Sequence, residues 1–256
     1  MNRWKNVKIL SNKEIVPGMY ELDILAPKMA QISEPGQFMN LYCKSESRLL
    51  PRPISICEIN KEAETLKLIY AVVGKGTEEI SQMREGETIK VMGPFGNGFK
   101  VGKEQDHIII GGGVGTPPLL ELVKHLKGKK RVYLGFRTNP ILVEAFEKHG
   151  AEVHVATEDG SFGTKGNVMD ILTKTEPQGD IVYSCGPKPM LKAVYNWAKE
   201  KNIPSQLSFE ERMACGIGAC LVCTCKIQRE QEVDWENRRV CKDGPVFNGD
   251  EVIWDD

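Results

Sequence analysis

The sequence predicts a chain of three parts. An antiparallel β-barrel is expected over residues 1–100, a doubly wound parallel α/β sheet over residues 101–205 and a small cysteine-rich segment over residues 206–256. Three observations support this prediction: short strand-like stretches between turn signals fill the first hundred residues, strands alternate with helices from residue 106, and five of the eight cysteines follow residue 214. With 256 residues the chain is long enough for two domains and a small third.

The first part contains six short stretches typical of strands. We expect strands over Val7–Leu10, Met19–Ala26, Gln37–Tyr42, Ile54–Ile59, Thr65–Val73 and Thr88–Met92. Turns break the series at Pro17-Gly18, Pro35-Gly36 and Glu85-Gly86, and one helix is expected to open near Thr77. Six short strands with turn signals between them indicate an antiparallel barrel.

Two stretches of this barrel carry groups that suit a phosphate ligand. Arg52-Pro53-Ile54-Ser55 opens a strand, where an arginine can fork onto a diphosphate and a small hydroxyl can reach a bound ring. Gly74-Lys75-Gly76-Thr77 stands at a helix start, where backbone amides form an anion site. Taken alone, the first stretch also fits a plain strand edge, and the second fits a turn with a helix cap.

From residue 106 the pattern changes to strands that alternate with helices. Strands are expected over His107–Ile110, Arg131–Gly135, Glu152–Thr157 and Asp180–Ser184. Helices are expected over Pro117–Leu126, Leu142–Lys148, Asn167–Lys174 and Lys188–Lys201. This alternation predicts a parallel, doubly wound sheet.

The first turn of that sheet is rich in glycine, with the sequence Gly111-Gly112-Gly113-Val114-Gly115-Thr116-Pro117. Glycine lets the backbone approach a diphosphate, and the helix end that follows attracts the negative charge. The usual dinucleotide fingerprint is incomplete, since Gly135-Phe136-Arg137-Thr138 has no acid after the second strand. Arg137 favours the 2′-phosphate of NADP, whereas the Glu158-Asp159-Gly160 turn favours a free ribose, and NAD is the preferred prediction.

The third part contains three cysteines spaced as Cys-x4-Cys-x2-Cys, at positions 215, 220 and 223, and Cys241 follows after seventeen residues. This is the plant-type spacing for a [2Fe–2S] cluster, whose iron prefers soft thiolate ligands. Gly216 leaves room for the backbone to fold around such a cluster.

Zinc and purely structural cysteines are the alternatives for this segment. Zinc sites favour two short cysteine pairs, and the distant pair is missing here. Cys225 is a spare cysteine, and its offset of two from Cys223 fits a strand that leaves the loop.

The overall composition is that of an ordinary globular protein, with 41% hydrophobic and 27% charged residues. The net charge of −1 implies no general attraction to nucleic acid. Residues 206–256 carry a net charge of −5 and the remainder carries +4, which fits a docking face as well as ordinary solvated charge.

We expect no secretory signal, no membrane span and a reducing, cytoplasmic environment. The histidines are scattered, and no Ser-His-Asp set or carboxylate pair suggests hydrolysis.

In this order, Arg52–Ser55 and Gly74–Thr77 resemble the flavin barrel of the ferredoxin-reductase family. The resemblance implies that Arg52 holds the FAD diphosphate, and that Ser55 lies by the flavin N5. It implies that Gly76 and Thr77 bind phosphate. It also implies flavin contacts for Pro53, Ile54, Ile69, Tyr70 and Ala71. The stretch Gly93–Phe99 then resembles the loop that joins this barrel to the next domain.

The second part resembles the nicotinamide domain of the same family, which has a glycine-rich turn with threonine and a later Cys-Gly-Pro. Here Cys185-Gly186-Pro187 stands after the last expected strand. The resemblance implies that Cys185 lies near the nicotinamide and acts with Ser55 in catalysis. It implies nucleotide contacts for Gly111, Gly113, Thr116 and Gly186. A buried cysteine that only packs the strand end is the alternative.

The whole chain closely resembles the electron-transfer subunits of class B dihydroorotate dehydrogenase. The resemblance rests on Glu-Arg-Met-x-Cys-Gly-x-Gly-x-Cys-x-x-Cys from Glu211, and on Arg-Val-Cys-Lys-Asp-Gly-Pro-Val-Phe from Arg239. It implies four cluster ligands, with 241 favoured as the fourth although Cys225 leaves this slightly open: Cys215, Cys220, Cys223 and Cys241. It also implies an FMN-containing catalytic partner that oxidises dihydroorotate, in a heterotetramer of two plus two subunits. Electrons would pass through [2Fe–2S] and FAD to NAD⁺, in pyrimidine biosynthesis.

Three other functions stay open at this point. The small subunit of an NADH-dependent ferredoxin:NADP oxidoreductase, or of a sulfide dehydrogenase, would use the same residues with another partner. A zinc-stabilised binding module would have no redox function. A redox sensor would carry a labile cluster and no flavin.

Overall fold

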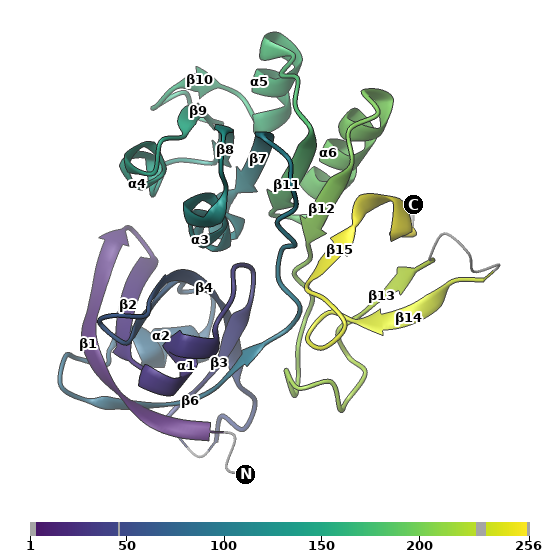
Figure 1. Ribbon diagram of the computed structural model, residues 1–256. Helices are drawn as coiled ribbons and strands as arrows, with labels where there is room; N and C mark the ends of the chain where they lie inside the picture. Colours follow the sequence, from purple (N-terminus) through teal and green to yellow (C-terminus); the bar gives the residue numbers. More distant parts are fainter. Residues whose placement is uncertain (1–3, 46, 229–233, 255–256) are drawn as a thin grey trace.

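The computed structural model describes residues 4–45, 47–228 and 234–254. Its described part has the predicted three-part architecture of a barrel, a sheet covered by helices and a C-terminal segment beside both (Figure 1). None of the helices in these ranges is long and apolar enough to cross a membrane.

Six strands close into an antiparallel barrel in the order β1-β2-β5-β4-β3-β6. Their bounds are β1 (Trp4–Val16), β2 (Met19–Leu25), β3 (Phe38–Tyr42), β4 (Arg52–Asn60), β5 (Thr65–Ala71) and β6 (Thr88–Phe95). The barrel interior is filled by fully buried aliphatic side chains from these strands: Ile9, Leu22, Ile24, Leu41, Ile56, Leu66, Leu68 and Val91. The predicted barrel is therefore confirmed, and alternating inward side chains supply its core.

The barrel differs from the sequence prediction in two elements. Strand β1 continues well past the expected Val7–Leu10, because its second half forms a hairpin with β2 that ends where Val16 pairs with Met19. Helix α1 (Pro27–Ile32) was not predicted. Proline at its first position has the right φ angle for a helix start, and Ala30 is wholly buried. The predicted helix near Thr77 is α2 (Lys75–Ser81).

A seven-stranded sheet follows, in the order β10-β9-β8-β7-β11-β12-β15. Its first strands are β7 (Asp106–Gly112), β8 (Lys129–Phe136), β9 (Glu152–Thr157), β10 (Thr164–Lys165) and β11 (Ile181–Cys185). The helices are α3 (Pro117–His125), α4 (Val143–Lys148), α5 (Val168–Thr175) and α6 (Lys188–Glu200), with the 3₁₀ turn η1 (Gly113–Gly115) before α3. The chain runs from β7 outward through β8, β9 and β10, then crosses back to β11 on the other side of β7, which is the doubly wound arrangement.

The C-terminal segment completes this sheet as well as forming a unit of its own. Strand β12 (Ser205–Ser208) runs across the expected limit at residue 205, and β15 (Val246–Asn248) pairs antiparallel with it. Strands β13 (Thr224–Ile227) and β14 (Glu236–Arg239) form a separate hairpin, and η2 (Gly249–Glu251) follows β15. Neither β12 nor β15 was predicted, because such short strands have little periodicity of their own and form through pairing with the sheet.

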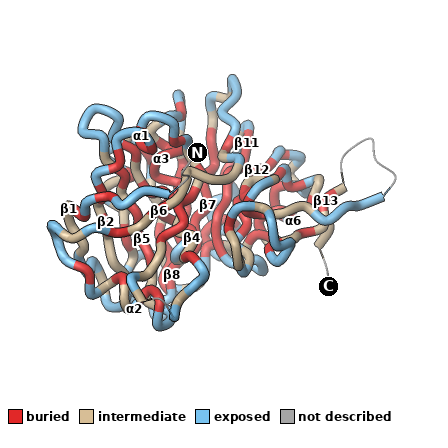
Figure 2. The backbone as a smooth tube through the Cα atoms, turned by 90° about the horizontal axis from the view of Figure 1, so that it is seen from below, coloured by how far each residue is buried: buried red, intermediate tan, exposed pale blue. Residues whose placement is uncertain are grey.

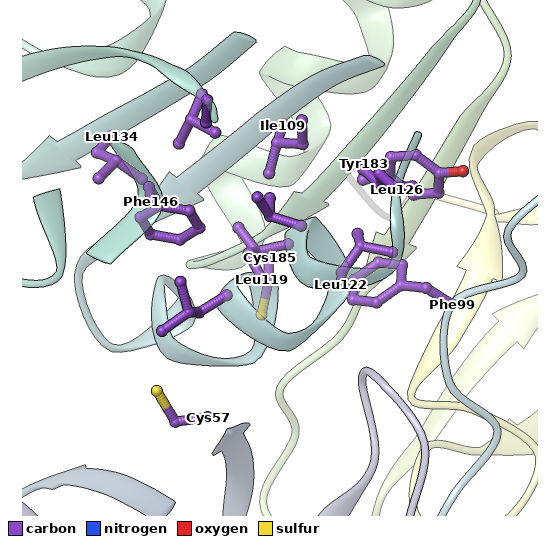
Figure 3. Packing of buried hydrophobic residues seen from close by; sticks show 14 of the residues in the cluster. Cys57, Phe99, Ile109, Leu119, Leu122, Leu126, Leu134, Phe146, Tyr183 and Cys185 are labelled. Carbon is purple, nitrogen blue, oxygen red and sulfur yellow. The ribbon is translucent and has the colours of Figure 1, made fainter. Parts of the chain in front are cut away.

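Buried residues run through the strands of both large parts, while exposed residues lie on the outer loops (Figure 2). One hydrophobic cluster crosses the junction: Cys57 of the barrel belongs to the same core as Leu119 and Cys185 of the sheet domain (Figure 3). Polar contacts join the same faces, since Glu121 Oε2 accepts the backbone N–H of Ile59 at 2.8 Å. Barrel and sheet therefore pack as one body, which holds their facing sites in a fixed relation.

Candidate functional site

The barrel brings Arg52, the first residue of β4, onto the start of helix α2. A Cβ atom built on Gly76 would lie 1.9 Å from Arg52 Nε, so the guanidinium group rests directly on the backbone of Gly76. The hydroxyl of Thr77 accepts the N–H groups of Val73 and Gly74 at 3.0 and 3.3 Å, which fixes the loop before the helix. A positive group thus lies beside backbone that only glycine leaves open, and this combination suits a diphosphate.

Other predicted flavin contacts line β4 and β5. Ser55 is half-buried and faces Phe38 across the β3–β4 pair, and the side chains of Pro53 and Ile54 between Arg52 and Ser55 are also half-buried. On β5, Ala71 is half-buried, whereas Ile69 and Tyr70 are buried.

Tyr70 is committed to the barrel wall. Its ring stacks on Tyr20 with a centroid separation of 5.8 Å, and its hydroxyl donates to Asn12 Oδ1 at 3.0 Å. Ile69 packs in the core shared with the sheet domain. Any contact of these two residues with a bound ring would therefore involve backbone more than a free side chain.

The predicted nucleotide-binding residues lie together between β7 and β11, where the order of the strands along the sheet reverses. Gly111, the second-last residue of β7, pairs with Cys185, which ends the neighbouring parallel strand β11. Open parallel sheets bind ligands at the carboxyl ends of such strands, at the point where the chain order reverses. The glycine-rich turn and Cys185-Gly186 therefore lie side by side at this end of the sheet.

Close backbone contacts explain the glycines of these two turns. A Cβ atom on Gly115 would lie 2.5 Å from the carbonyl O of Cys185 and 2.6 Å from Gly186 Cα, so the two turns touch directly. Gly113 has φ +52°, a conformation that favours glycine. Thr116 Oγ1 is fully buried and has no hydrogen-bond partner within the described residues. A buried hydroxyl that lacks a partner is consistent with a ligand group at this turn.

Cys185 is a neutral thiol. Burial raises the pKa of Cys185 to about 12, although a hydrogen bond with Ser208 acts in the opposite direction. Its side chain packs in the core beside Leu119 (Figure 3). Ser208 belongs to the unpredicted strand β12, so no local signal in the sequence pointed to this partner.

The residues that bear on NAD or NADP preference are neighbours in space. The N–H of Asp159 donates to the carbonyl O of Arg137 at 3.4 Å, so the turns after β8 and β9 lie side by side. Asp159 Oδ1 accepts both the N–H and the hydroxyl of Ser161, at 3.0 and 2.7 Å. These hydrogen bonds lower the pKa of Asp159, which keeps a carboxylate in the turn after β9.

The cysteine loop turns its amides onto its sulfur atoms. Cys215 Sγ accepts the N–H groups of Ile217 and Ala219 at 3.5 and 3.3 Å. Cys241 Sγ accepts the N–H of Gly218 at 3.0 Å. Gly218 has φ +82°, so the loop requires glycine there. Amide hydrogen bonds to sulfur stabilise thiolate ligands and tune iron–sulfur centres, so this loop suits that donor chemistry.

The four cysteines form two pairs. Cys220 hydrogen-bonds to Cys215, and Cys223 hydrogen-bonds to Cys241. No group of three or more potential ligands within the described ranges closes around a single ion. Two pairs of thiols, joined by a loop with inward amides, fit a cluster of two iron atoms better than one tetrahedral zinc ion.

The electrostatics of the two pairs differ. Burial opposes ionisation of Cys215, but the amides of Ile217 and Ala219 and the contact with Cys220 lower its pKa to about 6. Burial and the nearby sulfur of Cys223 raise the pKa of Cys241 to about 12. The spare Cys225 lies on β13, the strand predicted to leave the loop, where burial raises its pKa to about 12.

The cluster loop rests on the barrel at a residue that the sequence prediction missed. Asn40 of β3 donates from Nδ2 to the carbonyl O of Gly216 at 3.2 Å. Asn40 is also paired with Pro53, next to Arg52, across the β3–β4 ladder. A fully buried asparagine inside an apolar strand is the one local signal, since strands disfavour asparagine.

Known proteins share this arrangement. Residues 210–253 match the family model described as the iron-sulfur cluster binding domain of dihydroorotate dehydrogenase B. The electron transfer subunit of dihydroorotate dehydrogenase B (NAD(+)) from Caldanaerobacter subterraneus subsp. tengcongensis is 43% identical, over 98% of this chain and all of that protein. The subunit of the same name from Geobacillus sp. (strain WCH70) is 40% identical, over 99% of this chain and all of its own length.

Solved structures agree. A chain of the NADH-dependent reduced ferredoxin-NADP oxidoreductase is 29% identical and superimposes with a TM-score of 0.87, covering 99% of this chain and 92% of that one. A ferredoxin NADP⁺ reductase from Neisseria gonorrhoeae is 16% identical with a TM-score of 0.65, covering 78% and 92%, and shares the fold.

The barrel, the doubly wound sheet and the four-cysteine segment together define a ferredoxin reductase-like protein with an iron–sulfur binding segment. Within that class, the chain belongs to the family of electron transfer subunits of dihydroorotate dehydrogenase B (NAD(+)).

Proposed function

We propose that this chain carries electrons between a dihydroorotate-oxidising partner subunit and NAD⁺, through one [2Fe–2S] cluster and one FAD. Oxidation of one dihydroorotate to orotate releases two electrons and two protons, and NAD⁺ takes up both electrons with one proton to become NADH. When bound, the cluster supplies single-electron transfer and FAD supplies the exchange between single electrons and hydride.

One observation carries the proposal. The loop that bears Cys215 and its partner cysteines lies on strand β3, directly beside the strand that begins with Arg52. Residues suited to a cluster and residues suited to a flavin diphosphate are therefore separated only by adjacent strands of one barrel. Such closeness is what electron exchange between two bound groups requires.

At the flavin, Arg52 would hold the diphosphate with help from the helix start at Gly76 and Thr77. Ser55 Oγ would donate a hydrogen bond to the flavin ring at N5. The stretch Pro53–Ile54 and the β5 residues Ile69, Tyr70 and Ala71 would form the wall of the pocket. These roles are proposals, supported by the contact between Arg52 and Gly76.

At the nucleotide, the turn with Gly111, Gly113 and Thr116 would receive the diphosphate of NAD. Gly186 would leave room for the ring beside Cys185. A neutral thiol at Cys185 adds no charge next to the nicotinamide and helps exclude water. The ordered carboxylate of Asp159 supports NAD over NADP, because a carboxylate binds ribose hydroxyls and repels a 2′-phosphate.

At the cluster, Cys215 and Cys220 would bind one iron, and Cys223 and Cys241 the other. The pairing of the thiols and the amides aimed at their sulfur atoms support this assignment. The finer assembly is also proposed: the partner is an FMN-containing catalytic subunit, and the complex holds two subunits of each kind.

A second function deserves a test because one neighbour favours it. The NADH-dependent reduced ferredoxin-NADP oxidoreductase chain covers almost the whole fold at 29% identity. The dihydroorotate dehydrogenase subunits are more similar, at 40–43% identity. In this second function, electron transfer in an NADH-dependent ferredoxin-NADP oxidoreductase, the same binding residues would serve a different partner.

Purification of the native complex under anaerobic conditions tests the proposal. We expect flavin and [2Fe–2S] absorption, two kinds of subunit, and reduction of NAD⁺ by dihydroorotate. A colourless, zinc-containing protein contradicts the proposal outright. A coloured complex that does not oxidise dihydroorotate, but couples NADH to ferredoxin, supports the second function instead.

A further inference from the structure

The cluster-bearing segment is braced as one unit by Arg239. Its Nη1 donates to the carbonyl O of Gly218 at 3.1 Å, which ties the fourth-ligand segment to the first cysteine loop. Its Nε and the Asp243 carboxylate form an ion pair at 2.9 Å. The segment around Cys241 and the loop after Cys215 therefore move together rather than separately.

Two asparagines of the barrel part hold this unit, one on each ligand-bearing arm. Asn40 Nδ2 donates to the carbonyl O of Gly216, next to Cys215. Asn97 lies in the loop that leaves the barrel, and its Nδ2 donates to the carbonyl O atoms of Lys242 and Asp243, next to Cys241, at 3.2 and 3.0 Å. Both arms of the cluster segment are thus attached to the barrel by side-chain amides.

Asn40 is the more constrained of the two anchors. Its side chain is completely buried, whereas Asn97 is exposed. A Cβ atom on Gly216 would lie 2.5 Å from both Nδ2 and Oδ1 of Asn40, so the amide is pressed against the loop backbone. Gly216 also has φ +62°, so the contact and the backbone conformation both require glycine.

The free-energy cost of burying the Asn40 amide at this position points to a role beyond packing. Its Oδ1 is buried and has no partner within the described residues, so the side chain keeps an unused acceptor in the barrel wall. The neighbouring residues Met39 and Leu41 are apolar and fully buried, so the strand itself does not require a polar residue at position 40. Buried polar groups that are incompletely satisfied are costly, and they persist where another requirement imposes them.

We propose that Asn40 is the positioning residue that fixes the cluster loop against the flavin strand, and so sets both the electron transfer between the two centres and the environment of the cluster. This inference rests on the proposed function, because it assumes that the Arg52 strand binds FAD and that Cys215 binds iron. Asn40 acts through Gly216 on one side and through its ladder partner Pro53 on the other. It needs no contact with substrate.

The test uses the full-length chain loaded with FAD and cluster, with NADH as the electron donor. Asn40→Leu has the same branched shape and no amide, and Asn40→Asp keeps the shape but replaces the amide with a carboxyl group. Asn60→Asp is the matched control. Asn60 is the exposed last residue of β4, where Oδ1 accepts the N–H of Ala63, a contact that aspartate keeps.

Two rates are followed in one stopped-flow experiment: bleaching of the flavin by NADH, and the later appearance of the reduced-cluster signal by rapid-freeze electron paramagnetic resonance. We expect the first rate to be unchanged in both Asn40 variants. The second rate should fall in Asn40→Leu, because the loop that bears Cys215 is no longer held against the strand that begins with Arg52.

The reduction potential of the cluster provides a readout that packing alone does not move. Burial raises the pKa of the introduced carboxyl, so the potential is measured across pH: above that pKa, Asn40→Asp places negative charge beside Cys215 and should lower the cluster potential. Asn60→Asp should leave it at the parent value. Because hydrogen bonds and net charge set such potentials, the shift reports closeness to the cluster and not stability.

Each outcome decides between positioning and simple packing. Asn40 variants that hold the parent amounts of flavin and iron, transfer electrons at the parent rate and show the parent potential overturn the inference. Joint loss of flavin and cluster also overturns it, because Asn40 then supports the barrel as a whole. If Asn40→Leu does not fold, the potential of Asn40→Asp decides alone. A parent chain that lacks flavin or cluster refutes the proposed function instead.

Discussion

The guanidinium group of Arg52 covers the backbone of Gly76 so closely that a single methyl group on Gly76 would overlap Arg52 Nε at 1.9 Å. The overlapping atoms belong to the end of a flexible side chain, so the barrel can tolerate a methyl group there by displacing the arginine. The contact therefore offers a way to move Arg52 without removing it.

Gly76→Ala should weaken FAD binding as strongly as Arg52→Ala. Charge-assisted hydrogen bonds to a diphosphate contribute roughly 1.5–3 kcal/mol, so we expect about 10- to 100-fold weaker binding in both variants. Flavin titration of the unloaded protein measures the dissociation constant, and iron analysis should show an unchanged cluster. Gly74→Ala is the control, because nothing lies within 4 Å of its added methyl group. Tight flavin binding by Gly76→Ala would count against Arg52 as the diphosphate ligand.

Cys223→Ser should separate the two redox centres. A hydroxyl is a poor ligand for this cluster, so iron should be lost while the barrel and sheet keep FAD and NAD binding. NADH reduction of an artificial acceptor should survive, whereas dihydroorotate-to-NAD⁺ turnover with the partner should collapse.

Cys225→Ser is the matched control for that experiment, since Cys225 is buried on β13 and is not one of the proposed ligands. It should keep the cluster and both activities. If the Cys223 variant still reduces NAD⁺ with dihydroorotate at the parent rate, the electron path through the cluster is wrong. If it loses both activities together with folding, Cys223 merely packs the loop.

Glu121→Ala should loosen the junction between the sheet domain and the barrel. Glu121 is buried, accepts the N–H of Ile59 and contacts Lys124 Nζ at 2.7 Å. Removal leaves the N–H of Ile59 without its acceptor, while Lys124 Nζ keeps the carbonyl O of Ile59 at 3.3 Å, so the change should cost about 1–3 kcal/mol of unfolding free energy. Urea unfolding measures the change. Glu144→Ala, at an exposed position of α4, should have little effect on the unfolding free energy. Equal stability of the two variants would show that Glu121 does not stabilise the junction.

Stability should fall above about pH 9 partly because of Cys185. Its pKa is raised by burial to about 12 in the folded chain, from 9.0 for a free thiol. Above pH 9 the unfolded chain loses this proton while the folded chain keeps it, so unfolding becomes more favourable by up to about 1.4 kcal/mol per pH unit. Cys185→Ser has no such proton, and its unfolding free energy should therefore depend less steeply on pH between 9 and 10.5. Identical slopes in parent and variant would show that the thiol is not held neutral.

Local sequence signals were sufficient for much of the fold. Strand Glu152–Thr157 was predicted at its observed bounds, because its apolar pattern and flanking turns are contained in the segment itself. The spacing of the cysteines likewise indicated a loop around a cluster, and Gly218 adopts the positive φ that such a loop needs. These features depend on neighbours in the chain, so a single sequence carries them.

Long-range pairing decided the rest. Strand β12 forms by pairing with β11, and β15 forms by pairing with β12 at the edge of the sheet, although β15 comes from the segment expected to stand apart. Ser208 meets Cys185 through the parallel pairing of β12 with β11. Helix α1, with six residues, is too short to show a period of its own, and its burial against the barrel stabilises it.

What the sequence determined by itself was the chemistry available: thiols at the spacing of a cluster, an arginine at the head of a strand, and glycines at two turns. What only the tertiary structure decided was how these groups stand to one another. Asn40 and Gly216 are 176 positions apart, yet one hydrogen bond between them joins the barrel to the cluster loop. No periodicity or motif encodes that contact, because it arises only when the barrel has closed and the C-terminal segment has docked against it.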